Sequence, residues 1–306
     1  MTVSTSPRGT ANRISHVLNR ALGEERFPVD VEGVALEFSR LWYPADPIAK
    51  VQGEDLEGFE GMLTRHPSGT KWLILYNNGS PSEGRQRFTI AHELGHYLLH
   101  RRRQATFSCT AEDVGTSHAP GETLETEADE FAATLLMPLD DFRRQVADQT
   151  VSFDLLSRCA ERYGVSLTAA TLRWLDIAPG RAVLVVSRGV NILWAKASTA
   201  AFKSGLYFAT RQRTVPLPPE ALAHSDRAWA GDQTQQVPAQ VWFQREPESM
   251  LLTEMTKVAG GYDQTLTLLH LPAAKRVWRE PGDEDDGWEP GRRMGPPPIR
   301  NLNRSR

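Results

Sequence analysis

The chain has 306 residues, with 35 Lys and Arg against 38 Asp and Glu, and its formal net charge at pH 7 is −3. This length is enough for two domains of ordinary size, and the near-neutral charge does not by itself predict a nucleic-acid partner. No apolar run approaches the ~20 residues of a membrane span, and there is no apolar N-terminal leader. With only two cysteines, Cys109 and Cys159, the sequence predicts a soluble protein of a reducing cytoplasm without a membrane partner.

The first part of the chain alternates helical and strand patterns, separated by turn-forming residues. The predicted elements are a disordered arm at 1–9, a helix over 11–22, a helix over 28–41 after an extended approach, and strands at 59–66 and 71–76. The turn 67–70 joins the two strands. We expect one of these two strands to form the edge of a sheet beside the next helix and to bind an extended peptide there, with a place in the core of the sheet as the alternative.

That next helix carries the most informative motif, His92-Glu93-Leu94-Gly95-His96. Four residues make about one helical turn, so His92 and His96 project from the same face. Two imidazoles placed in this way can share one zinc ion at about 2.0–2.1 Å each. Glu93 is then the candidate general base that takes a proton from the attacking water. A chance match on an amphipathic helix is the alternative, so a third ligand is needed.

A second helix, predicted over Leu124–Met137, supplies that ligand. The metzincin pattern requires a glycine and a third histidine ligand at the positions that here hold Leu99 and Arg102, which excludes that class. Glu125 and Asp129 are four residues apart on one face, so Glu125 can ligate the metal while Asp129 accepts a hydrogen bond from a ligand histidine. Glu122 is a second candidate ligand, and Glu127 is expected to be solvated. Three protein ligands and one open position are typical of a catalytic zinc site.

Beyond this helix the pattern changes. Residues 139–149 and 153–177 are predicted to be helices that close a first domain, and Ala178-Pro179-Gly180 is a linker. Strands are predicted at 182–186, 190–194, 241–243 and 265–269, the first two forming a hairpin around Ser187-Arg188-Gly189. The predicted organisation is thus an arm at 1–9, a zinc metallopeptidase domain at 10–178, a regulatory or sensor domain at 181–271, with a simple buttress as the alternative, and a disordered tail at 272–306.

Three stretches resemble the signature of the ImmA/IrrE metallopeptidases. They are 87–100 around the histidine motif, 125–138 around Glu125, and 162–173 beginning Arg162-Tyr163-Gly164-Val165-Ser166. The resemblance covers roughly residues 30–177 and implies His92, His96 and Glu125 as Zn²⁺ ligands and Glu93 as the base. Asp129 stands where Asn is frequent, and either residue can accept the hydrogen bond. Members cut, or cause the cutting of, helix-turn-helix repressors.

Within that family, the two-domain organisation with a cysteine between the ligand helices is most similar to the CapP type. The resemblance implies a gene beside that of a repressor in a CBASS anti-phage operon and a response to DNA damage products. The implied fold class is α+β: a gluzincin-like zinc metallopeptidase domain followed by a smaller α+β or mostly β regulatory domain, for which a GAF-like fold is one form. Single-stranded DNA is the first candidate for an activator. This implication comes from the resemblance and not from net charge.

Several single residues have two interpretations each. Cys109 lies between the two ligand helices, where its thiolate could fill the fourth zinc position and hold a protease latent; a small buried hydrophobe is the alternative. Tyr163 and Arg173 are candidates for stabilising an oxyanion, with helix packing and surface charge favoured. His100 is too far along its helix to reach the same metal easily and is expected to pack or to support a ligand. Cys159 is assigned to the core.

Three classes of function remain. The first is a site-specific zinc endopeptidase that cuts a helix-turn-helix transcriptional repressor and so induces stress or anti-phage defence genes. The second is a repressor-binding regulator with little proteolytic activity, and the third is a nucleic-acid sensor. A general base such as Glu93 is of no use to a purely structural zinc site, which favours the first class.

Overall fold

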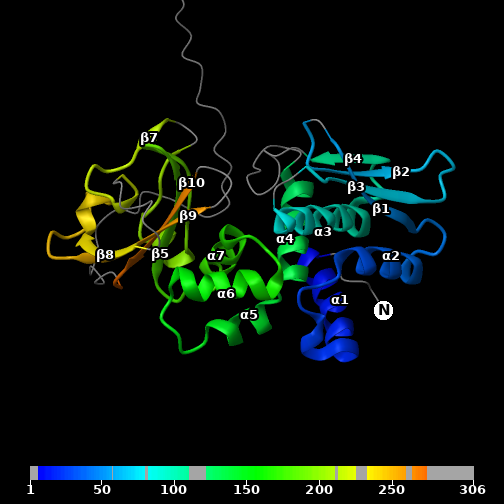
Figure 1. Ribbon diagram of the computed structural model, residues 1–306, viewed down its shortest axis with the longest axis horizontal. Coiled ribbons are helices and arrows are strands. Elements are labelled where there is room, and N and C mark those ends of the chain that lie inside the picture. The colour runs from blue at the N-terminus through cyan, green and yellow to red at the C-terminus, as the bar shows by residue number, and fades with distance from the viewer. Residues whose placement is uncertain are drawn as a thin grey trace, which may run out of the picture. The chain divides into compact units, whose positions relative to one another are not determined.

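The computed structural model describes residues 6–56, 58–79, 82–109, 122–210, 213–224, 233–259 and 264–273. They all belong to the first of two units of the chain, Met1–Ala273, and are drawn in colour in Figure 1. Most of the arm predicted at 1–9 and nearly all of the tail predicted at 272–306 lie outside the described residues. Among the residues described, no helix is both long enough and apolar enough to cross a membrane.

Two helices open the chain. Helix α1 (Pro7–Leu22) begins four residues earlier than predicted, because the Ser6 hydroxyl accepts the Gly9 N–H and Pro7 suits the first turn. A 3₁₀ turn, η1 (Gly23–Arg26), leads to α2 (Val31–Trp42), where the Asp30 carboxylate caps the Gly33 N–H. Helix α1 packs on α4 and α2 packs on β1, so both helices support the first sheet and the motif helix.

The first sheet has four strands in the order β1-β3-β2-β4: β1 (Ile48–Glu54), β2 (Gly61–Arg65), β3 (Trp72–Asn77) and β4 (Thr106–Cys109). Strand β1 runs parallel to β3, whereas β2 is antiparallel to both β3 and β4. The two strands predicted from sequence are therefore β2 and β3, and both are central. The prediction that one of them forms the edge is wrong: among the described strands, β4 is the edge next to β2.

The sequence did not predict β1 or β4. Strand β4 falls in a segment that seemed only polar, because three of its four residues are Thr, Ser or Cys and its single large apolar side chain is Phe107. Phe107 is buried, with 2% of its surface exposed, and anchors the strand. A four-residue edge strand with one buried side chain leaves almost no periodic signal in a sequence.

Helices α3 (Glu83–His100) and α4 (Glu122–Leu136) carry the motif residues and pack closely together. Gly95 makes this approach possible: a Cβ atom there would lie 3.1 Å from Phe131 Cδ1 and 3.2 Å from Ala128 Cα. Because Gly95 lies between the two ligand histidines and Ala128 lies one turn after Glu125, this contact sets the distance between the two halves of the metal site.

Three helices follow: α5 (Leu139–Val146), α6 (Phe153–Tyr163) and α7 (Leu167–Leu175). The single helix predicted over 153–177 is wrong, since α6 ends at Gly164, which has φ of 59°, and Ser166 caps α7. The Gly164-Val165-Ser166 stretch also lies against the start of α3, where a Cβ on Gly84 would come within 2.8 Å of the Val165 backbone. The third resemblance stretch therefore supports the motif helix.

The C-terminal part is β-rich. Its sheet has the order β7-β6-β5-β10-β9-β8, with β5 (Arg181–Arg188), β6 (Asn191–Ala197), β7 (Val215–Pro216), β8 (Gln233–Pro238), β9 (Leu251–Ala259) and β10 (Gln264–Leu271). The predicted hairpin is confirmed as β5 and β6, and the strand at 265–269 lies in β10. The strand predicted at 241–243 is wrong: a 3₁₀ turn over Ala239–Val241 ends at its first residue, and Trp242 and Phe243 follow outside any strand. A short helix, α8 (Thr199–Lys203), and a 3₁₀ turn, η2 (Leu222–His224), complete the part.

The two faces of this second sheet join different apolar cores. Val183 and Val185 of β5 belong to a core under α8 and η2, whereas Leu184 and Val186 pack into the same core as α6 and α7. This alternation explains why β5 reads as a continuous apolar run. The α+β class with a β-rich C-terminal region is confirmed, whereas the domain limits at 178 and 181 stay a prediction.

Candidate metal centre

Three side chains predicted as ligands converge. His92 Nε2 lies 3.0 Å from His96 Nε2 and 3.0 Å from Glu125 Oε2, and His96 Nε2 lies 3.2 Å from the same Glu125 oxygen. Both imidazoles are fully buried, and the Glu125 side chain is 21% exposed. Among the residues that the structure describes, this trio is a group of side chains able to hold a metal ion.

The distances fit a tetrahedral metal. Ligand bonds of ~2.0–2.1 Å at tetrahedral angles separate neighbouring ligand atoms by about 3.3 Å, close to the separations between these three atoms. Two imidazole nitrogens and a carboxylate oxygen are also the donor set that zinc takes in many hydrolases. The trio therefore fits a zinc ion held by three protein atoms. The side chain of Glu122, the second candidate ligand, lies outside the described residues.

The ring nitrogens that face away from the cluster also have partners that lead to carboxylates, directly for His92 and through His100 for His96. His92 Nδ1 is 2.8 Å from Asp129 Oδ1, as the sequence predicts. His96 Nδ1 is 3.1 Å from His100 Nδ1, and His100 Nε2 is 2.8 Å from Glu127 Oε2. His100 is thus a support for a ligand, in line with the sequence. Glu127, predicted to be solvated, is 34% exposed and in addition reaches the buried His100 from α4.

The pKa shifts of His96 and Glu125 favour the protonation states that bind a metal ion. Burial lowers the pKa of His96 to about 4, so its imidazole is neutral near pH 7 and keeps a lone pair for a metal. Burial alone would raise the pKa of Glu125, but hydrogen bonds from His92 and His96 outweigh it and hold the pKa well below its usual value. Glu125 is therefore an anion beside the neutral ring of His96.

Glu93 is fully buried on α3, and a glycine of the neighbouring strand makes space for it. A Cβ atom on Gly61 of β2 would lie 2.7 Å from Glu93 Oε1 and 2.4 Å from Thr89 Cγ2. Any larger residue at 61 would push against the carboxylate that the sequence predicts to act as base. No pattern in a single sequence identifies Gly61, because it depends on how β2 crosses α3.

Strand β4 borders the cluster. The Phe107 ring stacks on the His96 ring, with 4.6 Å between centroids. Backbone pairing in register places Cys109 opposite Gly61, although the Cys109 side chain lies outside the described residues. The fourth-ligand prediction for this cysteine therefore stays a prediction. Cys159 is a buried free thiol, as expected.

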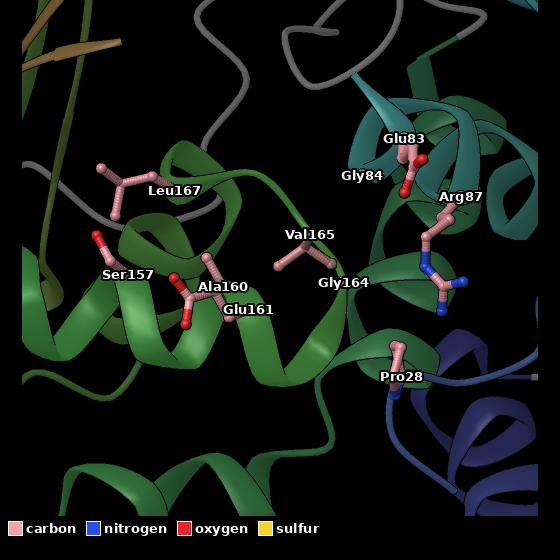
Figure 2. A pocket seen from close by; sticks show the side chains of 10 residues that line it. All are labelled: Pro28, Glu83, Gly84, Arg87, Ser157, Ala160, Glu161, Gly164, Val165 and Leu167. Carbon is pink, nitrogen blue, oxygen red and sulfur yellow. The ribbon is translucent and has the colours of Figure 1, made fainter. Parts of the chain in front are cut away.

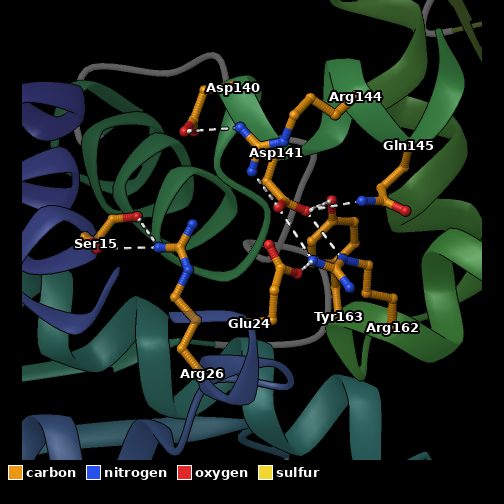
Figure 3. A network of polar contacts seen from close by, with 9 residues as sticks. All are labelled: Ser15, Glu24, Arg26, Asp140, Asp141, Arg144, Gln145, Arg162 and Tyr163. Atoms are coloured by element: carbon orange, nitrogen blue, oxygen red, sulfur yellow. Dashed lines mark hydrogen bonds and ion pairs between the residues drawn. The ribbon is translucent and has the colours of Figure 1, made fainter. Parts of the chain in front are cut away.

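Tyr163 and Arg173 have structural partners. The Tyr163 hydroxyl donates to the buried Asp141 Oδ1 at 2.7 Å, and Arg162 and Arg144 pair with the same carboxylate from the more exposed side (Figure 3). Burial alone would raise the pKa of Asp141, but hydrogen bonds from Arg162 and Tyr163 lower it. Arg173 donates to the Met137 carbonyl at 2.8 Å and is buried, so it is not a surface charge. Packing is thus the role that the structure gives both residues.

A separate cavity of about 370 Å³ lies where α6 and α7 meet the start of α3 (Figure 2). Its walls include Glu83, Arg87 and Glu161, and Arg87 also donates to the Val29 carbonyl. The cavity contains none of the three converging ligands. Its place in the fold is the junction that holds the motif helix against Gly164.

The sequence is similar to known proteins over the part of the chain that holds the three converging ligands. Residues 48–175 match the peptidase M78 family, described as an IrrE N-terminal-like domain. A curated relative, the metallopeptidase ImmA of Bacillus subtilis (strain 168), is 35% identical over 83 residues, which are 27% of this chain and 44% of that protein. The chain thus spans less than half the length of that relative.

A solved structure of a Mycobacterium tuberculosis transcriptional regulator is similar with a TM-score of 0.49 and 17% identity, over 85% of this chain and 86% of that one. The matched family region runs from β1 to α7 and contains the three converging ligands, Glu93 and Asp129. The sequence matches therefore support the ImmA/IrrE family of metallopeptidases for the part of this chain that holds the metal centre.

Proposed function

We propose that this protein is a zinc-dependent endopeptidase with His92, His96 and Glu125 as metal ligands. The observation that carries the proposal is the convergence of three ligand atoms within 3.0–3.2 Å of one another. None of these atoms needs to donate a hydrogen when a cation lies between them. Three protein ligands leave a fourth position for water or substrate, as in catalytic zinc sites.

The chain's own residues would divide the chemistry. When bound, zinc supplies a Lewis acid for a peptide carbonyl and for a water molecule. Glu93 takes the proton of the attacking water and can return it to the leaving amine. Asp129 fixes the ring of His92 through Nδ1. The packing of β2 at Gly61 holds the Glu93 carboxylate in one place, and Phe107 covers one face of His96.

The position of β4 at the edge of the first sheet favours a peptide as the substrate. A strand edge can bind an extended peptide by main-chain hydrogen bonds, with side-chain pockets adding specificity. Among the described strands, β4 is the edge beside His96 through Phe107. We infer that the substrate is an extended linker of a helix-turn-helix repressor, in line with the ImmA/IrrE resemblance, and that its cleavage induces stress or anti-phage genes in the cytoplasm.

Regulation through Cys109 belongs to the same proposal. The register of β2 and β4 places the Cys109 backbone opposite Gly61, the glycine that faces Glu93. A thiolate at the fourth metal position would exclude water and keep the enzyme latent. An activator, for which single-stranded DNA is the first candidate by resemblance to the CapP type, would bind the β-rich region and favour the open state.

The decisive experiment combines metal content with cleavage. The purified protein is incubated with helix-turn-helix repressors taken from the genes that flank its own, with and without a chelator, and with Glu93→Gln as the matched variant. We expect about one zinc per chain in both proteins and chelator-sensitive cleavage by the wild type alone. Absence of zinc that added zinc does not correct, or cleavage that persists in chelator, would refute the proposal. Repressor binding with zinc but equal, negligible cleavage by both proteins would favour a repressor-binding regulator or nucleic-acid sensor.

A further inference from the structure

We propose that His100 and Glu127 form a hydrogen-bonded relay that fixes the ring of His96 for metal binding. This inference rests on the proposed zinc site and adds two positioning residues to it. The relay runs from His96 Nδ1 to His100 Nδ1 over 3.1 Å and from His100 Nε2 to Glu127 Oε2 over 2.8 Å. Three histidines one turn apart on α3 form the column, and α4 supplies its terminal carboxylate.

The positions of the protons follow from the metal. His96 presents Nε2 to the cluster, so a metal-bound His96 must carry its proton on Nδ1. That proton points at His100 Nδ1, which must then be an acceptor. A neutral His100 with a bare Nδ1 carries its own proton on Nε2, and this proton points at the carboxylate of Glu127. With His96 bound to the metal through Nε2, only this pair of tautomers gives each N–H in the three-residue chain an acceptor.

The two ligand histidines are therefore supported in different ways. His92 donates directly to Asp129 at 2.8 Å, whereas His96 reaches its carboxylate through a second imidazole. The close approach of Gly95 to Ala128 brings α4 near enough for Glu125, Glu127 and Asp129 to reach the same column. Glu127 lies between the other two acids in the sequence, and its side chain is 34% exposed.

Burial makes this relay matter for affinity. His96 is fully buried and His100 is 1% exposed, so water cannot readily replace a lost partner. Phe107, itself 2% exposed, stacks on His96 at 4.6 Å and lies 6.2 Å from His100, covering both rings. A buried donor left without its acceptor costs free energy, and the loss of a group that orients a metal ligand typically lowers metal affinity by about 10–100-fold.

The test measures zinc affinity of the full-length chain by competition with a chromophoric chelator. Glu127→Ala and His100→Phe should each weaken zinc binding by about tenfold. His100→Asn keeps a carbonyl acceptor near the position of Nδ1, so its zinc affinity should fall less than that of His100→Phe. Glu130→Gln is the matched control, since Glu130 lies on the same helix but pairs with Arg8 away from the cluster, and its affinity should be unchanged.

A double-mutant cycle separates a relay from general packing. If Glu127 acts only through His100, Glu127→Ala should have almost no effect in the His100→Phe background. Nitrogen chemical shifts of the zinc-loaded wild type should show His96 protonated on Nδ1 and His100 protonated on Nε2. Additive effects, unchanged zinc affinity of Glu127→Ala, or His100 protonated on Nδ1 would overturn the relay. A wild type without zinc affinity would instead refute the proposed function.

Discussion

Glu125 of the helical half and Glu254 of the C-terminal sheet are both carboxylates withdrawn from water, but their neighbours differ in kind. Glu254 is fully buried and accepts hydrogen bonds from the Leu222 N–H at 2.9 Å and from Gln235 Nε2 at 2.8 Å. Glu125 faces two imidazole nitrogens that can themselves act as metal ligands. The neighbours of Glu254 can only donate hydrogen bonds to it, whereas the ring nitrogens beside Glu125 can either donate to the carboxylate or bind a cation together with it.

The pKa values of the two carboxylates are shifted in opposite directions. Burial raises the pKa of Glu254, and its hydrogen-bond donors only reduce that rise. For Glu125 the imidazole neighbours more than cancel the effect of burial, and the pKa falls. A buried acid is therefore informative about function only when its neighbours are examined, because burial alone is common to both.

The largest expected effect is on metal content. Glu125→Ala should reduce bound zinc from about one equivalent to near zero, because two imidazoles alone do not make a catalytic zinc site. Glu254→Gln, its counterpart in the sheet, should keep full zinc. Elemental analysis of both proteins after gel filtration measures this. Equal zinc loss in the two variants would mean that the contrast between the carboxylates is mistaken.

The second prediction concerns the space that a strand leaves for the base. Gly61→Ala places a Cβ atom against Glu93 Oε1 and Thr89 Cγ2, so we expect zinc to be kept while kcat falls by about 10²-fold, the scale of a misplaced catalytic group. The double variant Gly61→Ala with Thr89→Ser removes the contact with the threonine methyl. It should fold more stably yet remain slow. Full recovery of kcat would assign the defect to Thr89 instead of Glu93.

Much of the candidate site could be predicted from the sequence, because its signal is local. His92 and His96 are one turn apart, Glu125 and Asp129 are one turn apart on another helix, and helical spacing fixes both pairs. Gly61, Phe107 and Glu127 could not be predicted in the same way. Their roles depend on which strand crosses α3 and on how deeply α4 packs against it, and neither is encoded in spacing along the chain.

The fold shows the same division. The sequence predicts the hairpin β5–β6, since Ser187-Arg188-Gly189 separates two apolar runs, and Gly189 has the positive φ that such a turn uses. Strand β8 was missed because its sequence, Gln233–Pro238, is largely polar and only Val237 is buried among its six residues. Its pairing with β9 is a tertiary contact, and strand propensity depends on such contacts more than helix propensity does.

A third prediction concerns latency. If Cys109 holds the metal in a closed state, Cys109→Ala should raise basal cleavage about tenfold or more, as expected when the competent state is a minor population. Zinc content should stay near one equivalent, because His92, His96 and Glu125 remain. Steady-state cleavage without activator measures the effect, with Cys159→Ala as the matched control. A folded Cys109→Ala protein with wild-type basal activity would leave this cysteine without a regulatory role.

The smallest expected effect is on stability: the contribution of Glu254 to folding should depend on pH. The folded-state pKa of Glu254 is raised, so its contribution to stability is fully present below the unfolded-state pKa and is lost as pH rises through the folded pKa. Gln at this position does not titrate, and its amide oxygen can still accept from the Leu222 N–H. Thermal melts should therefore show the wild type losing stability relative to Glu254→Gln as pH is raised from below 4 towards neutrality. A difference between the two proteins that grows with pH in favour of the wild type would show that Glu254 is stabilised as an anion, and its neighbours would then resemble those of Glu125 after all.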